Sequence, residues 1–313
     1  MKSFTLAVAL LIGATSVALA QETLRVGDQK GNAQAVMEAA GVLKDVPYRI
    51  EWKEFAAAAP LLEAIGAGAI DTGLVGDAPF TFAAAANVPV KAITAIRQSG
   101  DGLAILVPET SAIKSFDDLK SKKIATGRGS VGHQLILAAL EKNGWTASDV
   151  QIVFLAPSDA KVAYSQGSVD AWSTWEPYVS QEEVLFKSRR LITAEGLTPG
   201  LSFTVATPDA IHDKRALLDD FVRRLAVARN WSLSHTEGYA ESWGRLMNIP
   251  PAVALNWLSR AKISIAPIDD AVVADEQKTI DLYFRAGLIK QKLDAAAIVD
   301  RSFADSIAKG AGL

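Results

Sequence analysis

The sequence predicts an α/β protein of two lobes, each with a mainly parallel sheet flanked by helices. Three observations support this prediction. The chain has 313 residues, more than one hydrophobic core usually holds. Short apolar runs alternate with apolar patterns of helical spacing, which favours parallel strands joined by helices. A small-residue turn followed by a hydrophobic residue and an aspartate occurs at residues 68–71 and again at 167–170, so two similar halves are expected.

The first 20 residues have the pattern of a cleaved secretory signal peptide. Lys2 precedes an apolar run over residues 4–17, and small residues stand before Gln21. The run is shorter than the roughly 20 residues that a membrane span needs, which disfavours an anchor. We expect a mature chain that begins near Gln21, and the loss of Lys2 takes the formal net charge from −3 to −4.

The composition excludes several classes of site. The chain has no cysteine, which rules out disulfides, thiolate metal sites, a cysteine nucleophile and a lipoprotein anchor. His133, His212 and His235 lack the spacing of a metal site. The net charge is weakly negative and does not match the basic surface of a nucleic-acid-binding protein. We therefore expect no metal, no cofactor and no nucleic-acid partner.

The lobe boundaries follow from where the alternation breaks. An apolar run that ends at Pro108 interrupts the rhythm, so a crossing is placed near residues 107–110 and the return near residues 202–207. The first lobe is then residues 21–108 with residues 206–313, and the second lobe is residues 109–205.

The first lobe is expected to begin with alternating strands and helices. Gly41 closes one helix and Pro60 opens the next, in keeping with glycine after a helix and proline in a first turn. From residue 214 onward the apolar spacing is helical, and these helices are expected to cover this lobe. The predicted strands are residues 24–27, 48–52, 69–75 and 90–96.

The second lobe repeats the pattern. Strands are expected at residue 124, over residues 150–155 and over residues 169–172, with helices over residues 131–143 and 160–166.

A glycine loop, residues 127–133 (GRGSVGH), joins a strand to a helix in this lobe. Free N–H groups of the first helical turn and the positive end of the helix dipole make such a loop an anion site. The G-x-G-x-x-G spacing also allows a dinucleotide site, but no acidic residue ends the next strand. A hydrolase would need glycine two residues before Ser130, where Arg128 stands.

Aromatic residues and one carboxylate gather at residues 172–178 (WSTWEPY). Proline prevents Trp172, Trp175 and Tyr178 from lying on one face of a regular helix, so we expect at least one tryptophan to contact a ligand. Glu176 either accepts a hydrogen bond from that ligand or begins a helix.

Five motifs, in this order, resemble the aliphatic-sulfonate-binding components of ABC importers, a family whose members also bind taurine or nitrate. The motifs are residues 28–32 (DQKGN), 76–79 (GDAP), 129–133 (GSVGH), 157–160 (PSDA) and 169–178 (VDAWSTWEPY). The resemblance runs from about residue 24 to at least residue 207.

This resemblance implies a monomeric type II periplasmic binding protein with two hinge crossings and no catalytic activity. It would close on a small organic anion, a sulfonate or sulfate ester, and deliver it to an ABC permease at the inner membrane. The ligand-binding residues implied by the resemblance are Gln29, Lys30, Gly31, Gly76 and Asp77 from the first lobe, and Gly129, Ser130, His133, Trp172 and Glu176 from the second.

Val131 stands where the family often has a second small hydroxyl residue, and this leaves the ligand open. A receptor for nitrate, taurine or a pyrimidine precursor is the alternative in the same fold, and a secreted serine hydrolase is the alternative from another class. Asp77 and Glu176 would repel a dianion, or would pair with an ammonium group of a zwitterionic sulfur compound.

Overall fold

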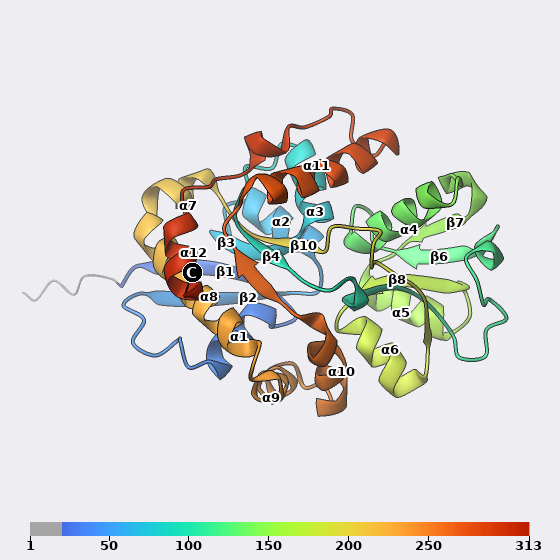
Figure 1. Cartoon of the computed structure of the whole chain (residues 1–313), viewed down its shortest axis with the longest axis horizontal. Helices are drawn as coiled ribbons and strands as arrows, with labels where there is room; N and C mark the ends of the chain where they lie inside the picture. Colours follow the sequence, from blue (N-terminus) through green and yellow to red (C-terminus); the bar gives the residue numbers. More distant parts are fainter. Residues whose placement is uncertain (1–20, 313) are drawn as a thin grey trace, which may run out of the picture.

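The computed structural model describes residues 21–312 and contains two β-sheets, each flanked by helices (Figure 1). The predicted signal peptide lies outside the described residues. The strands of the larger sheet are β1 (Thr23–Gln29), β2 (Arg49–Phe55), β3 (Thr72–Gly76), β4 (Lys91–Arg97), β10 (Leu201–Ala206) and β11 (Ser264–Ala266). They are ordered β11-β4-β10-β3-β1-β2.

The smaller sheet holds the middle of the chain. Its strands are β5 (Leu103–Val107), β6 (Lys123–Thr126), β7 (Gln151–Phe154), β8 (Ala171–Trp175) and β9 (Arg189–Thr193), ordered β7-β6-β8-β5-β9. Its helices are α4 (Val131–Lys142), α5 (Pro157–Ser165) and α6 (Tyr178–Phe186). Helices α4, α5 and α6 follow strands β6, β7 and β8 in the chain, so each helix begins near the carboxyl end of its strand.

The other helices belong to the two ends of the chain. They are α1 (Asn32–Ala39), α2 (Ala58–Gly66), α3 (Asp77–Ala85), α7 (Pro208–Asp213), α8 (Arg215–Ser232), α9 (Thr236–Met247), α10 (Pro251–Ala261), α11 (Asp270–Arg285) and α12 (Ala304–Ala311). Buried residues of α1, α8, α9, α10 and α12 form one hydrophobic core with strand β1. The C-terminal helices therefore cover the larger sheet, as the helical pattern from residue 214 indicated.

Both sheets are mixed, where the alternation predicted mainly parallel pairing. Strand β1 pairs in parallel with β2 and β3, but β10 lies antiparallel between β3 and β4. In the smaller sheet β6 is parallel to β7 and β8, whereas β5 is antiparallel to β8 and β9. Strands β5 and β10 are the ones that enter a sheet after the chain crosses from the other one, and the short edge strand β11 is also antiparallel to β4.

Strands β5 and β10 also show where the chain changes sheet. Strand β5 lies in the smaller sheet and β10 in the larger one, so each change comes one strand earlier than the predicted boundaries at residues 108 and 205. Both strands are apolar and buried, and apolar runs of this kind do not disclose which sheet they will join.

The two parts also meet outside the crossings. Helix α11 packs on α3 and α4 through Tyr283, Ile280 and Leu137, which belong to one buried apolar cluster. Within residues 21–312, no helix combines the length and apolarity needed to cross a membrane.

Candidate functional site

A cavity of about 680 Å³ is lined by residues from both sheets and from the segments that join them. Its wall includes the carboxyl ends of β1, β3, β7 and β8, and the first residues of helices α1 to α5. The carboxyl ends of parallel strands are where open α/β sheets generally bind ligands.

The structure brings most of the predicted site residues to this one cavity. Those that line it are Gln29, Lys30, Gly76, Asp77, Gly129, Ser130 and Glu176. Gly31, His133 and Trp172 do not line this cavity, so it gives no support to their predicted contact with a ligand. The backbone N–H of Gly31 instead donates to the Glu54 carboxylate at 3.0 Å.

Three helix N-termini lie at the cavity without acidic residues in their first turns. The Asp28 carboxylate caps that of α1, where it accepts two backbone N–H groups at 3.1 and 2.9 Å, so α2 and α4 remain. Helix α2 begins after Ala57, which has no side chain to cap it, and α4 begins after Ser130. The Ser130 hydroxyl accepts the N–H of His133 at 3.2 Å, which leaves the first two N–H groups of α4 without a helical partner. Because α2 and α4 come from different sheets, an anion between them meets the positive ends of both.

Among the described residues, Arg128 is one of the unpaired cations of the cavity wall, and Lys30 is another. Arg128 is exposed, and its guanidinium lies 4.0 Å from the centre of the Phe154 ring. No ion pair among residues 21–312 includes Arg128. Arg128 and Phe154 both line the cavity. An arginine that stacks on an aromatic face keeps its donors in a fixed plane, which suits a multi-oxygen anion.

The Asp77 carboxylate lies at the cavity wall and is held by three hydrogen bonds. It accepts hydrogen bonds from Gln134 Nε2 at 2.9 Å, Thr279 Oγ1 at 2.8 Å and the backbone N–H of Ala78 at 2.8 Å. Burial raises the pKa of Asp77, and these donors lower it in part. Since Gln134 belongs to α4 and Thr279 to α11, the carboxylate joins the two parts of the molecule.

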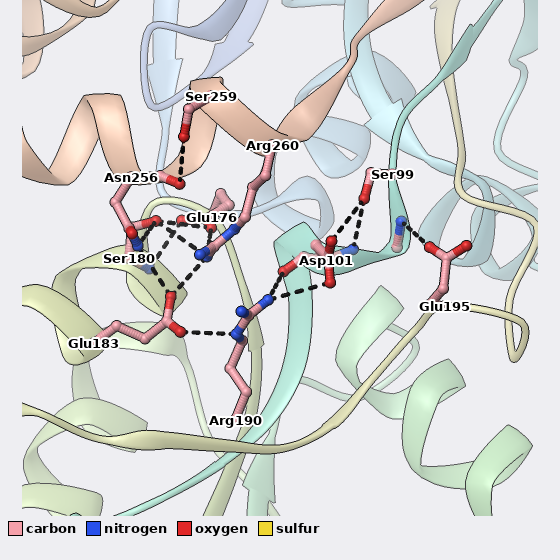
Figure 2. Close-up of polar contacts among 11 residues, drawn as sticks. Ser99, Asp101, Glu176, Ser180, Glu183, Arg190, Glu195, Asn256, Ser259 and Arg260 are labelled. Atoms are coloured by element: carbon pink, nitrogen blue, oxygen red, sulfur yellow. Dashed lines mark hydrogen bonds and ion pairs between the residues drawn. The ribbon is translucent and has the colours of Figure 1, made fainter.

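The Glu176 carboxylate is also occupied (Figure 2). It accepts the backbone N–H of Ser180 at 3.0 Å, the Ser180 hydroxyl at 2.9 Å and Arg260 Nη2 at 3.1 Å. The side chain is only 4% exposed, and burial raises its pKa to about 7 while Ser180 and Arg260 lower it.

His133 organises the glycine loop from behind the cavity. It is 2% exposed, and its Nδ1 accepts the N–H of Gly129 at 3.2 Å. Burial, with the nearby Arg128 charge, lowers its pKa to about 4, so the imidazole is neutral near pH 7. Ser130 donates its hydroxyl proton to the carbonyl of Gly127 at 2.7 Å, and no hydrogen bond joins it to the imidazole.

Trp172 is a core residue rather than a cavity residue. It is 2% exposed and packs between Tyr164 and Tyr178, with ring centres 6.0 and 5.5 Å away. Trp175, in the same motif, does line the cavity, and the contact of a tryptophan with a ligand stays a prediction.

Many further lining residues were not among the predicted ones, and four of them carry a charge or an aromatic ring that the site can use. They are Arg128, Phe82, Phe154 and Trp257. The sequence held a signal for Arg128, which stands inside the glycine loop, and for Phe154, which ends a strand. It held none for Trp257, because α10 reaches the cavity only through tertiary packing. Within residues 21–312 no group of three or more His, Asp or Glu side chains could hold a metal ion.

The chain is similar to known binding proteins. Residues 50–237 match the family model described as NMT1/THI5 like. An aliphatic sulfonates-binding protein of Escherichia coli (strain K12) is 33% identical over 92% of this chain and 93% of its own.

Two solved structures share the fold over most of their length. The alkanesulfonate-binding protein SsuA from Xanthomonas axonopodis pv. citri, bound to MOPS, has a TM-score of 0.83 and 30% identity, and the match covers 90% of this chain and 98% of that one. The periplasmic aliphatic sulphonate binding protein SsuA from Escherichia coli has a TM-score of 0.80 and 32% identity, over 89% of this chain and 92% of that one.

Proposed function

Since the chain belongs to the NMT1/THI5-like family, we propose that it is the periplasmic substrate-binding component of an ABC importer. It captures an aliphatic sulfonate or related organosulfur anion and delivers it to the permease. It acts as a monomeric receptor and not as an enzyme. Relatives named as sulfonate-binding proteins support the ligand class, and the electrostatics of the cavity support it independently.

The observation that carries this proposal is the charge balance of the cavity. The α2 and α4 N-termini, Lys30 and Arg128 are free to meet a ligand. Of the three carboxylates in the lining, Asp77 and Glu176 are held by other side chains, and Glu63 is exposed on α2. A sulfonate is a fully ionised monoanion with three acceptor oxygens. It therefore matches several donors arranged around one point.

The head group is proposed to lie at the glycine loop. There Arg128, the hydroxyl-capped turn at Ser130 and the N–H of Val131 supply donors from the smaller sheet. Lys30 and the α2 N-terminus face them from the larger sheet. An anion that bonds to both sides favours the closed arrangement of two lobes, so binding would shift a hinge equilibrium.

The rest of the ligand is proposed to be apolar. Phe82, Trp175 and Trp257 line the same cavity and offer aromatic surface to an alkyl chain. The acceptors of Asp77 and Glu176 are already bonded, so neither is offered to the ammonium group of taurine. The site thus suits an alkanesulfonate better than an amino analogue.

The hydrolase alternative has no support in the site. A serine nucleophile needs a base within hydrogen-bond reach, but the His133 imidazole accepts the N–H of Gly129 and the Ser130 hydroxyl bonds to Gly127. The relatives reported above are named as binding proteins.

The test is a melting-temperature screen of the purified protein at fixed ionic strength, with hexanesulfonate, taurine, nitrate and sulfate. At a hundred times its Kd a ligand stabilises the folded state by about 2.7 kcal/mol. We expect hexanesulfonate to raise the melting temperature most and taurine less. A melting-temperature increase with nitrate alone would support anion binding in this cavity but refute the sulfonate assignment.

A further inference from the structure

The inference concerns Arg260, which lies outside the cavity and contacts one of its carboxylates. Its Nη2 donates to Glu176 Oε1 at 3.1 Å and to Glu183 Oε2 at 2.7 Å (Figure 2). Arg260 is the only cation within ion-pair distance of Glu176 among residues 21–312. Both side chains are largely buried, at 18% and 4% exposed, so water screens this contact weakly.

The contact joins the two parts of the molecule. Arg260 lies in the last turn of helix α10, whose residues Ala254, Trp257 and Leu258 belong to the core of the larger sheet. Glu176 directly follows strand β8 of the smaller sheet. The arginine of one part therefore sets the charge of a cavity residue in the other.

The surrounding groups hold both side chains in place. Ser180 donates from its N–H and hydroxyl to Glu176, and Asn256 Nδ2 donates to Ser180 Oγ at 3.1 Å and to Glu183 Oε2 at 3.0 Å. On the far side of Glu183, Arg190 Nε lies 2.7 Å from Oε1, and Arg190 Nη1 lies 3.2 Å from Asp101 Oδ1. The charged groups around Glu176 are thus Glu183, Arg260, Arg190 and Asp101.

We propose that Arg260 is a positioning residue for anion binding, which holds the Glu176 carboxylate against α6 and compensates its charge. The inference rests on the proposed function, because it concerns the affinity of the same cavity for an anion. An uncompensated carboxylate in this wall would repel the ligand. The Glu176 carboxylate accepts three hydrogen bonds from Ser180 and Arg260, and the guanidinium balances its charge.

Removal of Arg260 has a consequence that depends on pH. Without the arginine, Glu176 loses its ion-pair partner, and burial then favours the protonated carboxyl. At low pH the carboxyl is neutral and tolerates the anion. At high pH it ionises without compensation, so anion affinity falls as pH rises.

The experiment is calorimetric titration of hexanesulfonate into four proteins at about pH 6 and about pH 8.5. They are the wild type, Arg260→Met, Arg260→Met combined with Glu176→Gln, and Arg190→Met as matched control. Arg190→Met removes an arginine from Glu183 without touching Glu176. Melting temperatures establish that each variant is folded.

We expect Arg260→Met to bind at least tenfold more weakly than the wild type at pH 8.5, and to lose much less at pH 6. The Glu176→Gln change should restore affinity at pH 8.5 to within about threefold, and Arg190→Met should not acquire the pH dependence. A loss in Arg260→Met that is equal at both pH values, or one that Glu176→Gln fails to rescue, assigns Arg260 a structural role and overturns the inference. A wild type that binds no sulfonate refutes the proposed function itself, and the role given to Arg260 with it.

Discussion

Replacement of Arg128 by methionine tests whether this unpaired cation of the glycine loop binds the ligand. The substitution keeps an unbranched side chain on Phe154 but removes the guanidinium that lies 4.0 Å from its ring centre. No ion pair of the described residues includes Arg128, so the change leaves no carboxylate without its partner. The fold should therefore tolerate it, and the loss should appear in binding.

The size of the loss follows from the surroundings of Arg128. A hydrogen bond to a charged group contributes about 1.5–3 kcal/mol. Two unit charges about 4 Å apart attract by about 4 kcal/mol near a protein surface, before desolvation is counted. Because Arg128 is exposed, we expect the lower part of this range. A loss of about 1.5–2.5 kcal/mol corresponds to roughly 10- to 60-fold weaker binding.

Calorimetric titration of hexanesulfonate at two salt concentrations measures this loss. Arg285→Met is the control, because Arg285 is an exposed arginine paired with Glu141 and lies outside this cavity. Arg128→Lys should fall between wild type and Arg128→Met, since lysine keeps the charge but not the planar donors. If Arg128→Met binds within twofold of the wild type, with the same salt dependence, Arg128 does not contact the anion.

Two further predictions concern the glycine loop. Gly129→Ala should destabilise the protein by about 1–3 kcal/mol and weaken sulfonate binding, because Gly129 has φ +68° and an added Cβ would lie 2.8 Å from Phe82. Gly144→Ala, at φ +69° with open space around it, is the control, and equal melting temperatures for the two variants would contradict the proposed clash. The second prediction concerns His133, because burial lowers the pKa of this imidazole to about 4 in the folded protein. In the unfolded chain the same imidazole takes up a proton below about pH 6.5. The contribution of neutral His133 to the free energy of unfolding is therefore present above pH 6.5 and is lost as the pH falls toward 4. His133→Gln should make the free energy of unfolding fall less steeply between pH 6.5 and pH 4 than it does in the wild type. His212→Gln, which changes an exposed histidine, should not. Equal declines in the wild type and both variants would exclude His133 as the source.

The local chemistry of the glycine loop could be predicted from the sequence. The loop was expected between a strand and a helix, and it lies between β6 and α4 with Ser130 as the N-cap. These features depend on residues close together in the chain. The sheet membership of β5 and β10 depends instead on hydrogen bonds to strands far along the chain, which periodicity does not report.

The same distinction explains why the two carboxylates were open to two interpretations. Asp77 and Glu176 each stand in a motif that resembles a binding site, so the sequence allowed either of them to face a ligand. Their partners are Thr279 on α11 and Arg260 on α10, which no local pattern connects to them. The identity of a residue sets its possible charge, but its partners decide how much of that charge a ligand meets. A cavity whose wall contains Asp77 and Glu176 can therefore bind an anion, provided that the C-terminal helices pack where these partners reach them.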